Sequence, residues 1–210
     1  MEVHDQALIH SSEDPNWRTP DACFEALRER FNFKIDAAAT LYDRKCSEYF
    51  GPDHLEESRV DALQVEWHRY VMPYEAIFLN PPYSRKQYRL TKNPAMAIDN
   101  WARKCWEESK KGCTIVGVFP FSPQTEWYRQ YVYGHRMYDG PKGEELTHDF
   151  WSWSGHAAME EWRLPHRISF LRPDGSKASN AGVNSVILVW RPNPGFVGPW
   201  TPATRYWSYR

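Results

Sequence analysis

The chain has 210 residues, a length that suits one domain with a core of ordinary size and no second domain. Its formal net charge is −1 at pH 7, so a nucleic-acid partner would have to bind a local basic face rather than the molecule as a whole. The four cysteines and eight histidines form no C-x-x-C or H-E-x-x-H pattern, and no signal region or apolar run of membrane-spanning length occurs. We therefore expect a cytoplasmic protein with no metal site and no membrane partner.

The chain begins with a polar stretch, residues 1–15, that predicts a loose tail. Apolar residues at spacings of three and four then predict a helix that Thr19 caps and Pro20 opens. A short strand is expected over 33–36, ending in the carboxylate of Asp36. The small residues that follow would let a ligand approach the backbone, although alanines stand where a glycine-rich loop is usual.

The stretch from residue 41 to 60 is polar and irregular, and no second strand is predicted there. Asp61 follows it and precedes the next apolar run by about the length of one short connecting element.

The apolar run 76–79 stops at Asn80-Pro81-Pro82-Tyr83, which predicts a short buried strand with a fixed polar end. Because Pro81 disfavours helical geometry in the residue before it, Asn80 should be extended, with its amide projecting from the end of the strand. An amide oxygen, a proline carbonyl and an aromatic ring make a site for a flat heterocycle that carries an amino group. The two oxygens would accept the amine hydrogens while Tyr83 stacks on the ring.

Further elements are expected after this motif. They are a basic loop over 85–92, a helix from about 94 to 110, a strand over 114–119 and a helix over 125–133. Residues 134–163 show no sustained period and predict an insertion, for which target recognition is the expected role. Two antiparallel strands are expected over 167–171 and 185–190, followed by an irregular tail.

The order of these segments resembles that of the phage and prophage DNA adenine N6-methyltransferases often called Dam-type, over about residues 16–190. The resemblance is carried by Trp17-x-Thr19-Pro20, Phe33-x-Ile35-Asp36-x-Ala38-Ala39, Asp61-x-Leu63, Asn80-Pro81-Pro82-Tyr83-Ser84, Trp101-x-x-Lys104, Thr125-x-Trp127 and Arg167-Ile168-x-Phe170. It implies a single Rossmann-like α/β domain that uses S-adenosylmethionine, with a mixed sheet and a C-terminal antiparallel strand pair. If the chain is phage-encoded, it would act in the host cell cytoplasm.

The resemblance also implies roles for particular residues. Transfer of a methyl group to an adenine flipped out of duplex DNA is expected to depend on Asn80, Pro81, Pro82 and Tyr83. The residues expected to bind the cofactor are Trp17, Thr19, Pro20, Asp36, Ala37, Ala38, Asp61 and Asn80. The residues expected to bind DNA are Tyr83, Ser84, Arg85, Lys86, Arg89 and Lys92.

Other readings of the motif stay open at the level of sequence. Related Asn-Pro-Pro-Tyr enzymes methylate RNA adenines or protein glutamine amides, which offer the same flat amino group. A nucleic-acid-binding module without turnover is a further alternative, since the glycine-rich loop is missing. Methylation at cytosine N4 is disfavoured because those enzymes more often carry serine in place of Asn80, and methylation at cytosine C5 is disfavoured because no Pro-Cys pair occurs.

Overall fold

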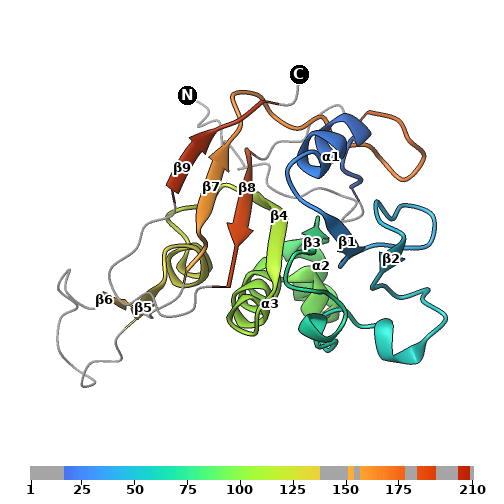
Figure 1. The fold of residues 1–210 in the computed structure, drawn as a ribbon, viewed down its shortest axis with the longest axis horizontal. Helices are drawn as coiled ribbons and strands as arrows, with labels where there is room; N and C mark the ends of the chain where they lie inside the picture. Colours follow the sequence, from blue (N-terminus) through green and yellow to red (C-terminus); the bar gives the residue numbers. More distant parts are fainter. Residues whose placement is uncertain (1–16, 138–150, 154–156, 178–183, 193–202, 209–210) are drawn as a thin grey trace, which may run out of the picture.

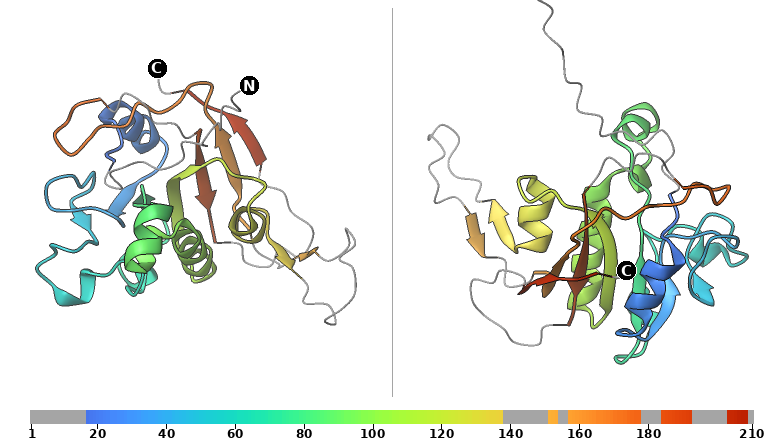
Figure 2. Two further views of the ribbon diagram at one scale, coloured as in Figure 1. Left: turned by 180° about the vertical axis from the view of Figure 1, so that it is seen from behind. Right: turned by 90° about the horizontal axis from the view of Figure 1, so that it is seen from above.

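A seven-stranded mixed sheet forms the centre of the molecule, with helices on both of its faces (Figures 1 and 2). The computed structural model describes residues 17–137, 151–153, 157–177, 184–192 and 203–208. The strand order is β2-β1-β3-β4-β8-β7-β9. Strands β1 to β4 are parallel to one another, β8 is antiparallel to both of its neighbours, and β9 is parallel to β7. The expected mixed sheet in an α/β fold is therefore present.

The elements have the following bounds. The sheet contains β1 (Phe33–Asp36), β2 (Glu48–Tyr49), β3 (Ala76–Leu79), β4 (Thr114–Pro120), β7 (Glu160–Arg163), β8 (Ser185–Trp190) and β9 (Ala203–Tyr206), and a separate two-stranded sheet pairs β5 (His135–Met137) with β6 (Trp151–Trp153). The α-helices are α1 (Asp21–Arg28), α2 (Arg85–Thr91) and α3 (Ile98–Lys110). Short 3-10 helices cover Glu57–Arg59, Trp67–Arg69 and Pro94–Met96, and a π-helix covers Tyr128–Val132.

Alternation of side chains along the strands produces two hydrophobic layers. Ile77 and Leu79 of β3 belong to a cluster that contains Trp101 and other residues of α3. Ala76 and Phe78, on the opposite face, pack in a second cluster with residues of α1. Because successive strand residues point to opposite faces, the four-residue strand β3 is buried on both sides. Asn80, the residue that follows β3, is thereby held at a fixed point at the carboxyl end of this strand.

The first helix differs from its prediction in its cap. It begins at Asp21, Pro20 occupies the N-cap position, and no side chain accepts a hydrogen bond there. The prediction that Thr19 caps this helix is wrong, because the helix starts one residue later than expected. Among the described residues, the hydroxyl of Thr19 has no hydrogen-bond partner, although the residue is almost completely buried.

Three further elements differ from expectation. Residues 85–91 form α2 rather than a loop, and the Ser84 hydroxyl caps it by accepting a hydrogen bond from the Gln87 N–H (3.3 Å). The helix predicted from residue 94 starts at Ile98, after a 3-10 turn. The two-residue strand β2 was not predicted, because a strand this short carries no period in the sequence.

The carboxyl-terminal strands also differ from the predicted pair. Residues 167–171 form no strand, and the antiparallel partner of β8 on this side is β7. The segment predicted as an insertion, 134–163, therefore ends within the central sheet. Burial explains this placement, because Glu161 is 1 % exposed and accepts hydrogen bonds from Tyr128 (2.6 Å) and Arg163 (2.7 Å).

Some predicted regions lie wholly or partly outside the described residues. These are the tail 1–15 and, within the predicted insertion, 138–150 and 154–156. The predicted irregular tail contains β9 within its described part. In the described part of the chain, no helix is both long enough and apolar enough to cross a membrane.

Candidate active site

A cavity of about 340 Å³ opens at the carboxyl ends of β1, β2 and β3. Asp36 ends β1, Phe50 and Gly51 follow β2, and Asn80 follows β3, and all four residues line the cavity. Strands β2 and β3 pair with opposite sides of β1. The strands that follow β1 in the chain therefore extend the sheet in opposite directions from it. In open α/β sheets this is the position at which ligands bind. The volume lies within the range of small-molecule sites.

Asp36 is a buried carboxylate with two backbone donors. It is 3 % exposed, and its oxygens accept hydrogen bonds from the N–H groups of Lys45 (2.9 Å) and Ala38 (3.4 Å). Burial raises the pKa of Asp36 to about 7, and the two backbone hydrogen bonds offset this only in part. A cationic group that entered the cavity would favour the ionised carboxylate.

The amide of Asn80 has a defined orientation. Its Nδ2 donates a hydrogen bond to the backbone carbonyl of Trp17 at 2.6 Å. A carbonyl can only accept, so this contact identifies the nitrogen side of the amide and leaves Oδ1 without a partner among the residues that the structure describes. Residues 63 positions apart in sequence thus cooperate to hold one acceptor at the end of β3.

Thr19 supplies a second polar group to the cavity wall. Thr19 is 2 % exposed, and its Oγ1 has no hydrogen-bond partner within the described residues. A buried hydroxyl without a partner costs free energy, about 1–3 kcal/mol. A polar ligand in the cavity would supply the missing hydrogen bond.

Gly51 brings two backbone segments of the cavity wall into close contact. A Cβ atom at this position would lie 1.7 Å from the carbonyl oxygen of Ala39, so only glycine fits. The neighbouring residue, Phe50, accepts a hydrogen bond from the Ala39 N–H at 3.1 Å. The small residues after β1 and the loop after β2 therefore form one rigid wall.

Substitution of Gly51 by alanine is expected to destabilise the fold by about 1–3 kcal/mol, because the added methyl group forces the wall apart. Thermal unfolding followed by circular dichroism measures the effect. Pro52→Ala, at the next cavity-lining residue, is the matched control and should leave the melting temperature nearly unchanged. Equal melting temperatures for Gly51→Ala and the wild type would show that the two backbones can separate without cost.

Asp61 is a further acidic residue of the cavity. Its residue is exposed and lines the cavity, and its Oδ1 accepts a hydrogen bond from the Leu63 N–H at 3.0 Å. Ala62 and Leu63 line the cavity beside it. Asp61 therefore lines the same cavity as the acidic residues Asp36 and Asp43.

The structure brings together about half of the residues that the sequence singled out. Cavity-lining residues among them are Trp17, Thr19, Asp36, Ala38, Asp61, Asn80 and Pro82. Those outside the lining are Pro20, Ala37, Pro81, Tyr83, Ser84, Lys86, Arg89 and Lys92, and the side chain of Arg85 lies outside the described part. Ala37 instead packs in the core, and burial raises the pKa of Tyr83 from 10 to about 12.

The cavity also has lining residues that were not predicted as site residues, and most of them come from irregular segments. They are Arg18, Thr40, Asp43, Lys45, Phe50, Gly51, Pro52, Val60, Ala62, Leu63, Gln64, Phe78, Asn93, Pro94, Ala95, Met96 and Trp101, together with Ala39. The Gly51-Pro52 pair is the one sequence signal for this wall, since such a pair marks a turn. In the described part of the chain, no group of histidine, cysteine and acidic side chains could hold a metal ion.

Comparison with known proteins shows the family to which the chain belongs. A family model described as DNA N-6-adenine-methyltransferase (Dam) matches residues 6–201. The chain belongs to this family. It is therefore an adenine-specific DNA methyltransferase, and the predicted Dam-type resemblance is confirmed. No curated protein and no solved structure matches the chain significantly.

Membership in the Dam family indicates the substrate of the protein and the atom that is methylated. A DNA N6-adenine methyltransferase acts on the exocyclic amine of adenine, and DNA is its substrate. Asn80, whose Nδ2 is bonded to the Trp17 carbonyl, lines the cavity, as does Pro82. Two residues of the Asn-Pro-Pro-Tyr motif, Asn80 and Pro82, therefore line the same cavity as Asp36.

Proposed function

We propose that the cavity binds S-adenosylmethionine and that the turn Asn80–Tyr83 presents a flipped adenine to it. One observation carries this proposal. Asp36 and Asn80 lie at the carboxyl ends of the adjacent parallel strands β1 and β3, where the strand order changes direction, and both line the cavity. The strand order β2-β1-β3-β4 supports a Rossmann-like fold for this half of the sheet. We also take the chain to be a single methyltransferase domain.

The donor set of the cavity fits S-adenosylmethionine. Asp36 can pair with the amino group of the methionine part, and Asp61 can accept from a ribose or adenine group. The unpartnered hydroxyl of Thr19 has room to bond a polar atom, and the rings of Trp17 and Trp101 line the walls. Pro20, Ala37 and Ala38 would contribute as neighbours of Thr19 and Asp36, by keeping the polar groups of these two residues close to the backbone. When bound, the cofactor supplies an electrophilic methyl group.

The catalytic contribution of the protein is to orient the amine of the target base. The lone pair of adenine N6 is delocalised into the ring, so the amine is a weak nucleophile. Asn80 Oδ1 and the Pro81 carbonyl would accept its two hydrogens, which favours a tetrahedral nitrogen with its lone pair toward the methyl donor. Pro82 keeps the turn rigid, and the neutral ring of Tyr83 would stack on the base.

The helix that follows the turn is the proposed contact with the DNA backbone. Lys86, Arg89 and Lys92 are exposed, and no acidic residue occurs within 85–92. Arg85 adds a fourth positive charge, and Ser84 fixes the start of the helix. Four cations beside the site through which the base enters are complementary to phosphates.

Removal of the three exposed charges is expected to weaken duplex binding and to lower the slope of log K against log salt by about 2–3. Suitable replacements are Lys86→Gln and Arg89→Gln, which favour the helix, and Lys92→Asn, which tolerates the left-handed φ of 56° at that residue. Fluorescence anisotropy with a labelled duplex at several salt concentrations measures the slope. Arg28→Ala, in helix α1, is the control and should keep the wild-type slope. An unchanged slope in the triple variant would show that α2 does not contact the DNA backbone.

Residues 134–163 are proposed to contribute to target recognition, apart from the part that forms β7. Within this segment β5 and β6 form a small sheet separate from the central one (Figure 1). An element that is not part of the central sheet is free to vary with the recognised sequence.

The decisive test of the proposed function uses methyl-labelled S-adenosylmethionine and unmethylated duplex DNA, followed by digestion and mass analysis of the nucleosides. Labelled N6-methyladenine nucleoside is the expected product. Parallel reactions with RNA and with protein test the other acceptors of an Asn-Pro-Pro-Tyr site. Calorimetric titration with the cofactor alone separates binding from turnover, and absence of binding would overturn the assignment of the cavity.

A further inference from the structure

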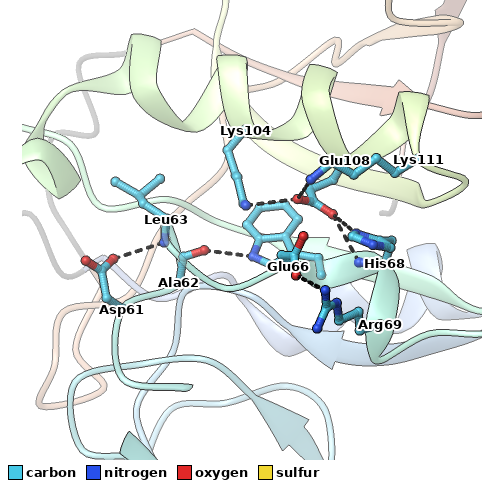
Figure 3. Close-up of polar contacts among 10 residues, drawn as sticks. Asp61, Ala62, Leu63, Glu66, His68, Arg69, Lys104, Glu108 and Lys111 are labelled. Carbon is cyan, nitrogen blue, oxygen red and sulfur yellow. Dashed lines mark hydrogen bonds and ion pairs between the residues drawn. The ribbon is translucent and has the colours of Figure 1, made fainter. Parts of the chain in front are cut away.

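Helix α3 carries a fully buried carboxylate, Glu108, that does not line the cavity (Figure 3). Its Oε1 accepts hydrogen bonds from the ammonium groups of Lys104 (2.9 Å) and Lys111 (3.1 Å). Its Oε2 accepts a hydrogen bond from the backbone N–H of His68 (3.0 Å) and lies 3.0 Å from His68 Nδ1. Burial alone would raise the pKa of Glu108, but the bonds from Lys104 and His68 lower it to about 2. The group is therefore a permanent anion at neutral pH.

Stability is a weak explanation for such a cluster. A buried ion pair contributes little net stability compared with well-packed apolar residues of the same volume, because both charges lose their hydration. What the cluster does provide is position, since Oε2 is bonded to both the backbone and the ring of His68. It fastens the 3-10 turn Trp67–Arg69 to the last turns of α3.

Trp67 carries this attachment toward the cavity. It is fully buried, and its indole Nε1 donates a hydrogen bond to the carbonyl of Ala62 at 2.8 Å. The ammonium group of Lys104, already bonded to Glu108, lies 5.6 Å from the centre of the Trp67 ring. Ala62 stands between Asp61 and Leu63, and all three line the cavity. A continuous series of contacts therefore joins Glu108 to the wall that contains Asp61.

The same helix sets the position of a second part of the wall. Trp101, two turns before Glu108 on α3, lines the cavity and donates an indole hydrogen bond to the carbonyl of Ala95 at 2.8 Å. Ala95 also lines the cavity. The segment 50–70 has no strand and contains only two short 3-10 helices, so side-chain contacts with α3 contribute to its position.

We propose that Glu108 and His68 are positioning residues that set the affinity for S-adenosylmethionine by holding the Asp61–Leu63 wall in place. Neither residue lines the cavity. The inference rests on the proposed function, because it assumes that this wall contacts the cofactor. It predicts a loss of cofactor affinity while methyl transfer at saturating cofactor is retained.

The first test is calorimetric titration of His68→Ala with S-adenosylmethionine, combined with steady-state kinetics on duplex DNA. The side chain of His68 is 27 % exposed, so its removal need not unfold the chain, which circular dichroism checks. We expect affinity to fall about tenfold and kcat to stay within about twofold, because one bond to a charged group is lost. Glu108→Gln should act in the same direction. His68→Asn, whose amide can replace the Nδ1 donor, should restore most of the affinity.

Glu66→Gln is the matched control, since Glu66 forms an exposed ion pair with Arg69 in the same segment and, within the described residues, has no hydrogen bond or ion pair to α3. It should bind the cofactor like the wild type. Wild-type affinity in folded His68→Ala and Glu108→Gln, with weakened binding in Asp61→Asn, would overturn the positioning role and leave the proposed function intact.

A double-mutant cycle separates positioning from general destabilisation. If His68 acts through Asp61, the variant carrying both Asp61→Asn and His68→Ala should bind no more weakly than Asp61→Asn alone. Fully additive losses would show that His68 acts elsewhere and would overturn the inference. If Asp61→Asn binds like the wild type while His68→Ala does not, Asp61 has no cofactor role and the positioning acts through Ala62 and Leu63.

Discussion

Asn80→Ala is expected to lower kcat for adenine methylation by about 10²–10³, while the affinity for S-adenosylmethionine changes by less than about threefold. The substitution removes Oδ1, which the hydrogen bond from Nδ2 to the Trp17 carbonyl leaves free for the target amine. Loss of one oriented hydrogen-bonding group at a reacting centre typically costs a factor of this size. The core should be unaffected, because the four residues of β3 before Asn80 carry the burial.

Asn80→Asp distinguishes the acceptor from the structural bond. Aspartate keeps an acceptor for the amine but loses the donor to Trp17, and an oxygen would then lie against a carbonyl where the nitrogen now stands at 2.6 Å. We expect activity between those of the wild type and of Asn80→Ala. Methyl transfer to duplex DNA under saturating cofactor measures both variants. A kcat within tenfold of the wild type for Asn80→Ala would refute the proposed role of the amide oxygen.

Sequence reasoning located the strands that carry the site because their signals are local. The runs predicted over 33–36, 76–79 and 114–119 are rich in apolar residues, and each forms a strand at or within one residue of its expected bounds. A buried strand that ends in Asn-Pro-Pro-Tyr fixes the direction in which the asparagine projects. The family and its reaction could therefore be predicted from these segments, and the family match confirms them.

What the sequence could not give depends on contacts between distant segments. The bond between Asn80 and Trp17 joins positions 63 apart, and the bond between Glu108 and His68 joins positions 40 apart, neither of which has a local period. Strand β7 was missed because Glu161 is a charged residue inside a buried strand, and burial of a charge becomes acceptable only through its bonds to Tyr128 and Arg163.

Asp36 is expected to make cofactor binding depend on pH near neutrality. Its pKa is about 7 in the folded chain, against an ordinary value of 3.8, because burial outweighs the backbone hydrogen bonds from Lys45 and Ala38. The nearby charge of Asp43 raises this pKa further, and that of Lys45 lowers it. If the ionised carboxylate binds the cationic amino group, affinity should be constant above about pH 7. It should fall about tenfold for each pH unit below that value.

The sign of the effect on stability is opposite. A carboxyl group whose pKa is raised on folding favours the folded state fully below pH 3.8, and this contribution is lost as the pH rises through about 7. The cofactor-free protein should therefore lose stability from Asp36 over the range in which cofactor affinity increases. The cofactor would offset that loss by pairing with the carboxylate.

Asp36→Asn tests both halves of this argument in one variant. It removes the ionisation but keeps the shape, so cofactor affinity should drop about 100-fold at pH 8 and lose its dependence on pH. The difference in unfolding free energy between wild type and variant should shift between pH 4 and pH 8 in favour of the variant. Calorimetric titration and denaturant unfolding over this range measure the two quantities. If Asp36→Asn keeps the wild-type pH profile of cofactor affinity, another group controls binding. Asp61→Asn is the control, because Asp61 is an exposed carboxylate of the same cavity. The pH profile of cofactor affinity should persist in this control.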